Sequence, residues 1–133
     1  MDIEHLVFET GPKRVGPFSH AVKAGEFIFV TGQMPTLVDN PDVLVSNDIE
    51  KQTHQVMQNL KNVLKQSGSS LDRVTFVRIY LVNFQDFDKM NKIYESYLIL
   101  RAPGFINIPS QPPCIKLRIF KWEEWFSGES KTE

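Results

Sequence analysis

A long amphipathic segment between residues 47 and 68 most constrains what this chain can fold into. Its apolar residues recur at three-, four- and seven-residue spacing and predict a helix with one buried face: Ile49, Val56, Met57, Leu60, Val63 and Leu64. Asn47 lies three residues before Glu50, which is typical of a capping box, and Gly68 is a natural helix stop. A helix of about 20 residues spans about 30 Å, the width of a small domain.

Strands are predicted before this helix. The β-prone runs cover residues 5–8, 18–23 and 27–31, and a Gly-containing turn between the last two is typical of an antiparallel hairpin. Residues 35–47 carry two Pro residues and several turn-forming residues, so we expect a loop there.

After the helix, residues 73–82 predict a long central strand, residues 86–98 a second helix and residues 115–120 a last, alternating strand. Four Pro residues between 101 and 114 limit any strand there to an edge or to a broken one, because Pro cannot donate to a ladder. The order predicts an α+β fold in which two helices pack on one face of a mixed sheet.

The other face of that sheet would then be uncovered. Which residues point outward there depends on the strand register. The candidates are bulky and apolar, for example Phe29, Val77, Ile79 or Phe120. An exposed apolar face of several hundred Å² predicts self-association. We therefore expect an oligomer.

Length and composition exclude several classes of protein. The 133 residues suit a single domain over residues 1–126, followed by a polar tail at 127–133. Fifteen basic against sixteen acidic residues argue against a nucleic-acid partner, and no apolar run approaches the ~20 residues that a membrane span needs. Cys114 is the one cysteine, so neither a disulfide nor a Cys-based zinc site is expected. These features predict a cytoplasmic protein.

Motifs for phosphate binding, zinc-dependent hydrolysis or a serine nucleophile elbow are not found in the sequence. Its histidines, His5, His20 and His54, are far apart. We expect His54 to be a solvated residue on the polar side of the long helix, and His20 to be more often structural than ligand-binding. Nothing in the sequence around Cys114 indicates a lowered thiol pKa.

Several blocks of sequence carry a resemblance to a known family. The first two are GPFSHAVKAG at residues 16–25 and FVTGQMP at residues 29–35; the long helix with DIE at 48–50 and the segment GSSLD at 68–72 follow in order. Leu81-Val82-Asn83 and the helix with Met90-Asn91 continue the match. Over about residues 7–97 the chain resembles the Rid (YjgF) family, and the order of the blocks makes the resemblance specific.

This resemblance implies a chorismate-mutase-like fold and a homotrimer whose sheets form an inner β-barrel, with ligand clefts between subunits. Such a trimer would cover the apolar sheet face. Deaminating members hydrolyse reactive enamines and imines to 2-oxo acids and ammonia, with no cofactor and no metal. The implied partner is a small carboxylate-bearing metabolite.

The resemblance also implies site residues. Arg101 is the predicted catalytic residue, because a planar guanidinium can grip the substrate carboxylate; the family's Pro-x-Arg order is not kept there. Phe18 stands where the family usually has Tyr, and Thr31 where it often has Ser. Gly32 and Asn91 are expected to shape the cleft. Lys116 falls at or near the position where the family usually has a glutamate that helps to hold the hydrolytic water. If Lys116 lines the cleft, a lysine ammonium group stands in place of a carboxylate that accepts hydrogen bonds.

Three hypotheses follow. The first is an enamine/imine deaminase. The second is a non-catalytic, trimeric paralogue that binds a small carboxylate or other metabolite and also a protein partner. The departures at Phe18, Lys116 and the shortened segment 98–101 motivate the second. The third, a ribonuclease or translation inhibitor, conflicts with the balanced charge and the lack of an aromatic-plus-basic stripe.

Overall fold

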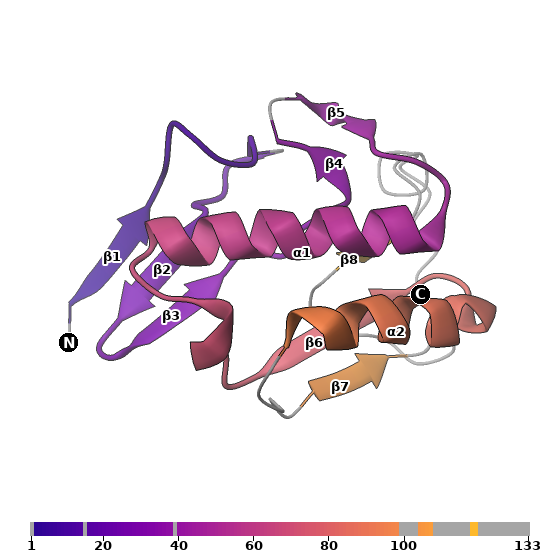
Figure 1. Ribbon diagram of the computed structural model, residues 1–133. Helices are drawn as coiled ribbons and strands as arrows, with labels where there is room; N and C mark the ends of the chain where they lie inside the picture. The colour runs from indigo at the N-terminus through magenta and orange to yellow at the C-terminus, as the bar shows by residue number, and fades with distance from the viewer. Residues whose placement is uncertain (1, 15, 39, 99–103, 108–117, 120–133) are drawn as a thin grey trace.

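The computed structural model describes residues 2–14, 16–38, 40–98, 104–107 and 118–119 (Figure 1). Its central element is helix α1 (Ile49–Gln66), which confirms the long amphipathic helix. The predicted cap at Asn47 is wrong by one residue, because the Asp48 carboxylate accepts a hydrogen bond from the backbone N–H of Glu50 at 3.0 Å. Gly68 follows the helix with φ of 86°, in the left-handed region that favours glycine, so the predicted stop is confirmed.

An antiparallel sheet precedes α1. It contains β1 (Ile3–Leu6), β2 (Ala21–Ala24) and β3 (Phe27–Val30) in that spatial order. The turn between β2 and β3 has Gly25 at φ of 59°, as the predicted hairpin requires. β2 begins three residues later than predicted, because residues 16–18 form a turn that the Phe18 N–H closes on the Gly16 carbonyl at 2.7 Å.

The expectation that residues 35–47 form only a loop is wrong. β4 (Thr36–Leu37) and β5 (Asn40–Leu44) pair there as a short antiparallel ribbon. Pro41 lies within β5, and a strand with a single hydrogen-bonded neighbour tolerates a residue that cannot donate.

The second half of the chain supplies a parallel arrangement. β6 (Val77–Leu81) lies between β7 (Gly104–Asn107) and β8 (Arg118–Ile119) and runs parallel to both. Among the described residues β7 lies at an edge of this group, as its Pro-rich surroundings predict. The strand predicted at 73–82 is shorter in the structure: Arg73 belongs to the 3-10 turn η1 (Leu71–Arg73), residues 74–76 are irregular, and β6 ends at Leu81.

A second helix, α2 (Phe87–Tyr97), follows the 3-10 turn η2 (Phe84–Asp86) and confirms the prediction for residues 86–98. His54 of α1 is exposed, as expected, and its Nδ1 lies 2.8 Å from the Tyr97 hydroxyl of α2. The α+β class with an antiparallel sheet and two helices is therefore confirmed. Among the described residues the strands form three hydrogen-bonded groups, so a single mixed sheet joining them remains a prediction.

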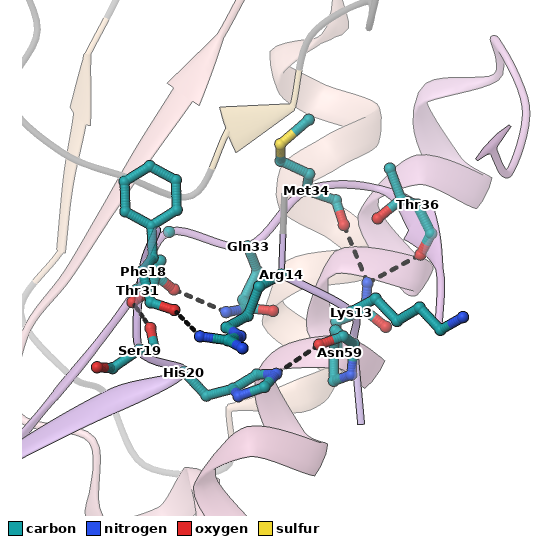
Figure 2. Close-up of a pocket in the computed structure, with 12 residues that line it drawn as sticks. Lys13, Arg14, Phe18, Ser19, His20, Thr31, Gln33, Met34, Thr36 and Asn59 are labelled. Carbon is teal, nitrogen blue, oxygen red and sulfur yellow. Dashed lines mark hydrogen bonds between the residues drawn. The ribbon is translucent and has the colours of Figure 1, made fainter. Parts of the chain in front are cut away.

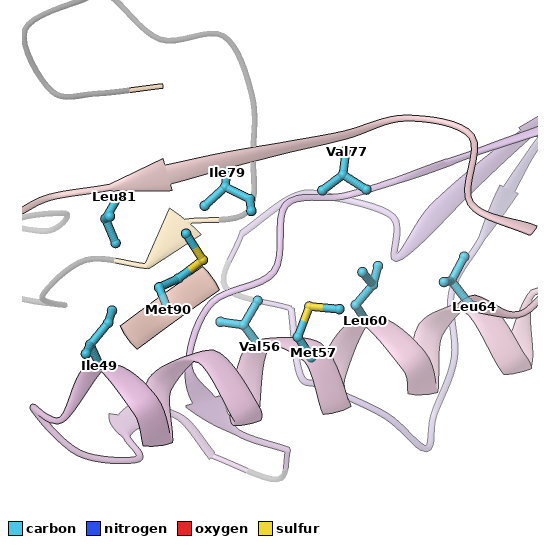
Figure 3. Close-up of a cluster of buried hydrophobic side chains, with 9 residues drawn as sticks. All are labelled: Ile49, Val56, Met57, Leu60, Leu64, Val77, Ile79, Leu81 and Met90. Carbon is cyan, nitrogen blue, oxygen red and sulfur yellow. The ribbon is translucent and has the colours of Figure 1, made fainter. Parts of the chain in front are cut away.

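The main hydrophobic core lies between α1 and β6, with Met90 of α2 beside them (Figure 3). Its buried members are Ile49, Val56, Met57, Leu60, Leu64, Val77, Ile79, Leu81 and Met90. Val77 and Ile79 therefore do not face outward, and this part of the predicted apolar face is wrong. The period-two pattern of β6 puts residues 77, 79 and 81 on the side that α1 covers.

Other apolar side chains stay uncovered in the single chain. Phe29 is 62% exposed, which confirms it as an outward residue, and Phe27 and Phe76 are similarly exposed. These aromatic residues line a groove of about 440 Å³ between β3 and the segment that leads into β6. Phe120 lies outside the described residues. No helix in the described part of the chain combines the length and apolarity of a membrane span.

Candidate functional site

A small pocket lies where the segment before β2 meets the segment after β3, next to α1 (Figure 2). It is open to solvent on one side, and its volume of about 50 Å³ accommodates a group of only a few heavy atoms. The lining residues are Pro12, Lys13, Arg14, Phe18, Ser19, His20, Thr31, Gly32, Gln33, Met34, Thr36 and Asn59. Below we call this the Phe18–Thr31 pocket.

The turn at residues 16–18 places Phe18 at the edge of the pocket, where its side chain is 44% exposed. Gly16 packs closely against this ring: a Cβ atom at position 16 would lie 2.8 Å from the Phe18 Cε2 atom. The glycine therefore permits the observed position of the phenyl group.

Thr31 connects the end of β3 to the segment before β2. Its hydroxyl donates to the Ser19 carbonyl at 2.5 Å, and its backbone N–H donates to the His20 carbonyl at 3.1 Å. Because the hydroxyl proton is already used, the Thr31 oxygen can interact with a ligand only as an acceptor.

His20 is 5% exposed and has partners on both ring nitrogens. The Phe8 N–H donates to Nδ1 at 3.1 Å, which assigns the proton to Nε2, and Nε2 then donates to the Pro12 carbonyl at 2.6 Å. Its ring also lies 5.4 Å from the ring of Phe8. His20 lines the pocket, yet neither nitrogen is available to act as a base, so its role is structural.

Asn59 of α1 fixes the far side of the pocket. Its amide nitrogen donates to the carbonyls of Met34 and Thr36, both at 3.0 Å, and its oxygen accepts from Gln55 Nε2 at 2.9 Å. Gln33 adds a hydrogen bond from its Nε2 to the Thr31 carbonyl at 2.7 Å. These bonds hold the segment 31–36 in place against α1.

The charged residues that line the pocket are Lys13 and Arg14, and no Asp or Glu is among the described lining residues. Arg14 Nη1 donates to the Phe18 carbonyl at 3.3 Å (Figure 2). Sequence reasoning missed both cations. Their position shortly before Gly16-Pro17-Phe18 was the available signal, because Arg14 is four residues from the Phe18 carbonyl to which it donates.

The structure brings together three of the predicted site residues, Phe18, Thr31 and Gly32, around this pocket. Asn91 lies in α2 and is half-buried, and it is not among the described residues that line the pocket. Arg101, Lys116 and Cys114 lie outside the described residues, so their predicted roles remain untested. In the described part of the chain, no three His, Cys, Asp or Glu residues group in a way that could hold a metal ion.

The sequence of this chain is similar to those of several known proteins. Residues 8–108 match the family model described as Endoribonuclease L-PSP. A RutC family protein of Pyrococcus abyssi is 43% identical over 105 residues, which cover 79% of this chain and 82% of the relative. Reactive Intermediate Deaminase A of Arabidopsis thaliana, a chloroplastic protein, is 35% identical over 96 residues, or 72% of this chain and 51% of the relative.

The fold comparison agrees. The crystal structure of the yeast protein YEO7 superimposes with a TM-score of 0.75 at 36% identity, covering 80% of this chain and 84% of that chain. The resemblance inferred from the sequence blocks is therefore confirmed. Relatives include proteins named mitochondrial and chloroplastic, so the compartment does not follow from the similarity.

Proposed function

Because the chain belongs to the Rid/YjgF family, whose family model is described as Endoribonuclease L-PSP, we propose that it hydrolyses reactive enamines and imines. In this reaction water adds to the imine carbon, the C–N bond breaks, and a 2-oxo acid and ammonia are released. An enamine first tautomerises to its imine. We propose that the reaction needs no cofactor.

The observation that carries this proposal is the Phe18–Thr31 pocket. It gathers an apolar ring, a hydroxyl oxygen that can only accept, and two cations around a space for a group of a few heavy atoms. An imine of a 2-oxo acid presents a matching set of groups: an N–H donor, a carboxylate and a short carbon chain. We propose that the imine N–H donates to the Thr31 oxygen, which would orient the electrophilic carbon.

Further parts of the proposal rest on the family resemblance. We propose that Arg101 grips the substrate carboxylate, that Asn91 and Gly32 shape the cleft, and that Lys116 lies near the site of water attack. We also propose a homotrimer. The exposed phenylalanines along the groove between β3 and β6 support self-association, because burying them would remove apolar surface from water.

One observation favours the second candidate, a paralogue that binds a carboxylate without turnover. Among the described lining residues there is no carboxylate that could orient water, and both nitrogens of His20 are engaged. A general base must be within hydrogen-bond reach of the water that it activates. The candidates therefore differ in whether this chain accelerates hydrolysis at all.

The test is a coupled assay. A dehydratase generates 2-aminoacrylate, and pyruvate release is followed with wild-type protein, with Arg101→Ala and without added protein. Acceleration by the wild type that Arg101→Ala loses supports the deaminase and its proposed clamp. Release at the uncatalysed rate with folded wild-type protein would contradict the deaminase and favour the binding paralogue.

A further inference from the structure

We propose that Arg14 binds the carboxylate of the ligand in the Phe18–Thr31 pocket. The choice of a 2-oxo acid as ligand rests on the proposed function. The position of the guanidinium, by contrast, comes directly from the structure. Arg14 lines the pocket, and Figure 2 shows it among Phe18, Thr31 and Gln33.

Most hydrogen-bond donors of Arg14 have no partner among the described residues. A guanidinium carries five N–H donors, and the structure gives Arg14 one hydrogen bond, from Nη1 to the Phe18 carbonyl. Among the described residues no carboxylate forms an ion pair with Arg14. The side chain is exposed, and the 3.3 Å bond places the guanidinium at the pocket edge with most of its donors available to a ligand.

The charged side chains that line the pocket are both positive. The chain as a whole carries a formal net charge of −1, so a cationic pocket is a local feature and not a consequence of a basic protein. Lys13 and Arg14 line the pocket together, and its described lining residues contribute no negative side chain. Hydrogen bonds between a guanidinium and a carboxylate are about twice as strong as neutral ones, and the planar fork favours bidentate binding.

The backbone that leads to Arg14 is held in place before a ligand binds, by hydrogen bonds at Thr10, Pro12 and Lys13. The Pro12 carbonyl accepts from His20 Nε2, and the Lys13 N–H donates to the Val38 carbonyl at 3.1 Å. Gln66 of α1 bonds to both the hydroxyl and the carbonyl of Thr10. A backbone fixed before binding loses little entropy when a ligand arrives.

An ionised carboxylate has two oxygens with about four lone-pair sites, so it can accept more than one hydrogen bond from the Arg14 guanidinium. The ligand class that follows is a short-chain carboxylate, with its charged end toward Arg14 and its carbonyl or imine group toward Thr31.

The test is an equilibrium titration of the full chain with pyruvate and with pyruvamide, its uncharged analogue. Calorimetry gives the dissociation constants, and backbone amide NMR shifts of Thr31 and Gly32 show whether binding occurs in this pocket. The variants are Arg14→Gln and the control Lys51→Gln, which also removes one positive charge, at an exposed residue that lines neither this pocket nor the groove between β3 and the segment before β6. Thermal melts establish that both variants are folded.

We expect the wild type to bind pyruvate at least tenfold more tightly than pyruvamide, with shifts at Thr31 and Gly32. Arg14→Gln should weaken pyruvate binding at least fivefold and leave pyruvamide binding unchanged, while Lys51→Gln changes neither. A smaller loss in folded Arg14→Gln, an equal loss in Lys51→Gln, or no pyruvate binding by the wild type would overturn the proposal.

This titration is independent of turnover. If pyruvate binding depends on Arg14 but imine hydrolysis is absent, the proposed function fails and the anion site stands. If hydrolysis is present and Arg14→Gln binds pyruvate as the wild type does, the proposed function stands and the anion site at Arg14 fails.

Discussion

Replacing Asn59 with Asp tests whether the far wall of the pocket is held as the structure shows. The substitution keeps the shape of the side chain and changes its NH₂ group to an oxygen. Asn59 is 1% exposed, and its amide nitrogen donates to the carbonyls of Met34 and Thr36 at 3.0 Å. An ionised Asp cannot donate, so both bonds are lost and carboxylate oxygen faces two carbonyl oxygens.

The magnitude follows from these contacts. Two neutral hydrogen bonds contribute about 1 kcal/mol each, and leaving buried polar groups without partners adds about 1–3 kcal/mol. The expected loss in the free energy of unfolding is therefore about 3–5 kcal/mol. For a chain of this length, that loss lowers the melting temperature by about 10 °C or more.

Urea denaturation and thermal melts at one fixed protein concentration measure the effect. Asn62→Asp is the matched control on the same helix, because the Asn62 amide oxygen accepts from Gln66 Nε2 at 2.5 Å and a carboxylate keeps that bond. It should change stability by less than about 0.5 kcal/mol. If Asn59→Asp stays within about 1 kcal/mol of the wild type, the described role of Asn59 is incorrect.

Three further predictions use other residues. The Tyr94 hydroxyl is buried without a hydrogen-bond partner in the described part of the chain, so Tyr94→Phe should keep or slightly raise the unfolding free energy. Burial raises the pKa of the Tyr94 hydroxyl from 10.0 to about 12, so the folded state keeps its full stability from this group below pH 10 and loses it as the pH rises toward 12. Tyr94→Phe should therefore lose less unfolding free energy between pH 10 and 12 than the wild type. Equal losses in the two proteins would contradict the burial of this hydroxyl. Gly16→Ala should displace the Phe18 ring and raise the KM for the imine without lowering the melting temperature by more than about 2 °C, whereas an unchanged KM would refute the contact. Any RNA binding should show a flat response to salt; a steep decrease with salt would revive the ribonuclease hypothesis.

The elements that depend on local patterns were predictable from the sequence. The 3.6-residue period of α1 and the β-prone run of β3 are properties of neighbouring residues, and both are confirmed. The cap was missed by one position, because Asn47 and Asp48 are both competent caps and only the folded chain shows which one meets an N–H. Likewise, alternation identified residues that share a face of β6, but it could not tell that Val77 and Ile79 face α1.

The candidate site was predictable only where the family pattern reaches it. Phe18, Thr31 and Gly32 were named from sequence, and the structure places them around one pocket. The roles of Arg14 and Asn59 in this pocket were not predicted, because they depend on how the chain folds around it. Asn59 meets the carbonyls of Met34 and Thr36 across 23 to 25 residues, and no local spacing shows that pairing.

We propose that imine hydrolysis takes place in the Phe18–Thr31 pocket. The most direct test is the value of kcat/KM for 2-aminoacrylate-derived imine with wild-type, Thr31→Val and Thr31→Ser proteins. Thr31→Val removes the hydroxyl oxygen at nearly constant volume, whereas Thr31→Ser keeps it. We predict that the wild type accelerates hydrolysis, that Thr31→Ser stays within about threefold of it, and that folded Thr31→Val loses at least tenfold, because the oxygen that accepts from the imine is gone. Equal activity of wild type and Thr31→Val, or no acceleration by either, would contradict the claim.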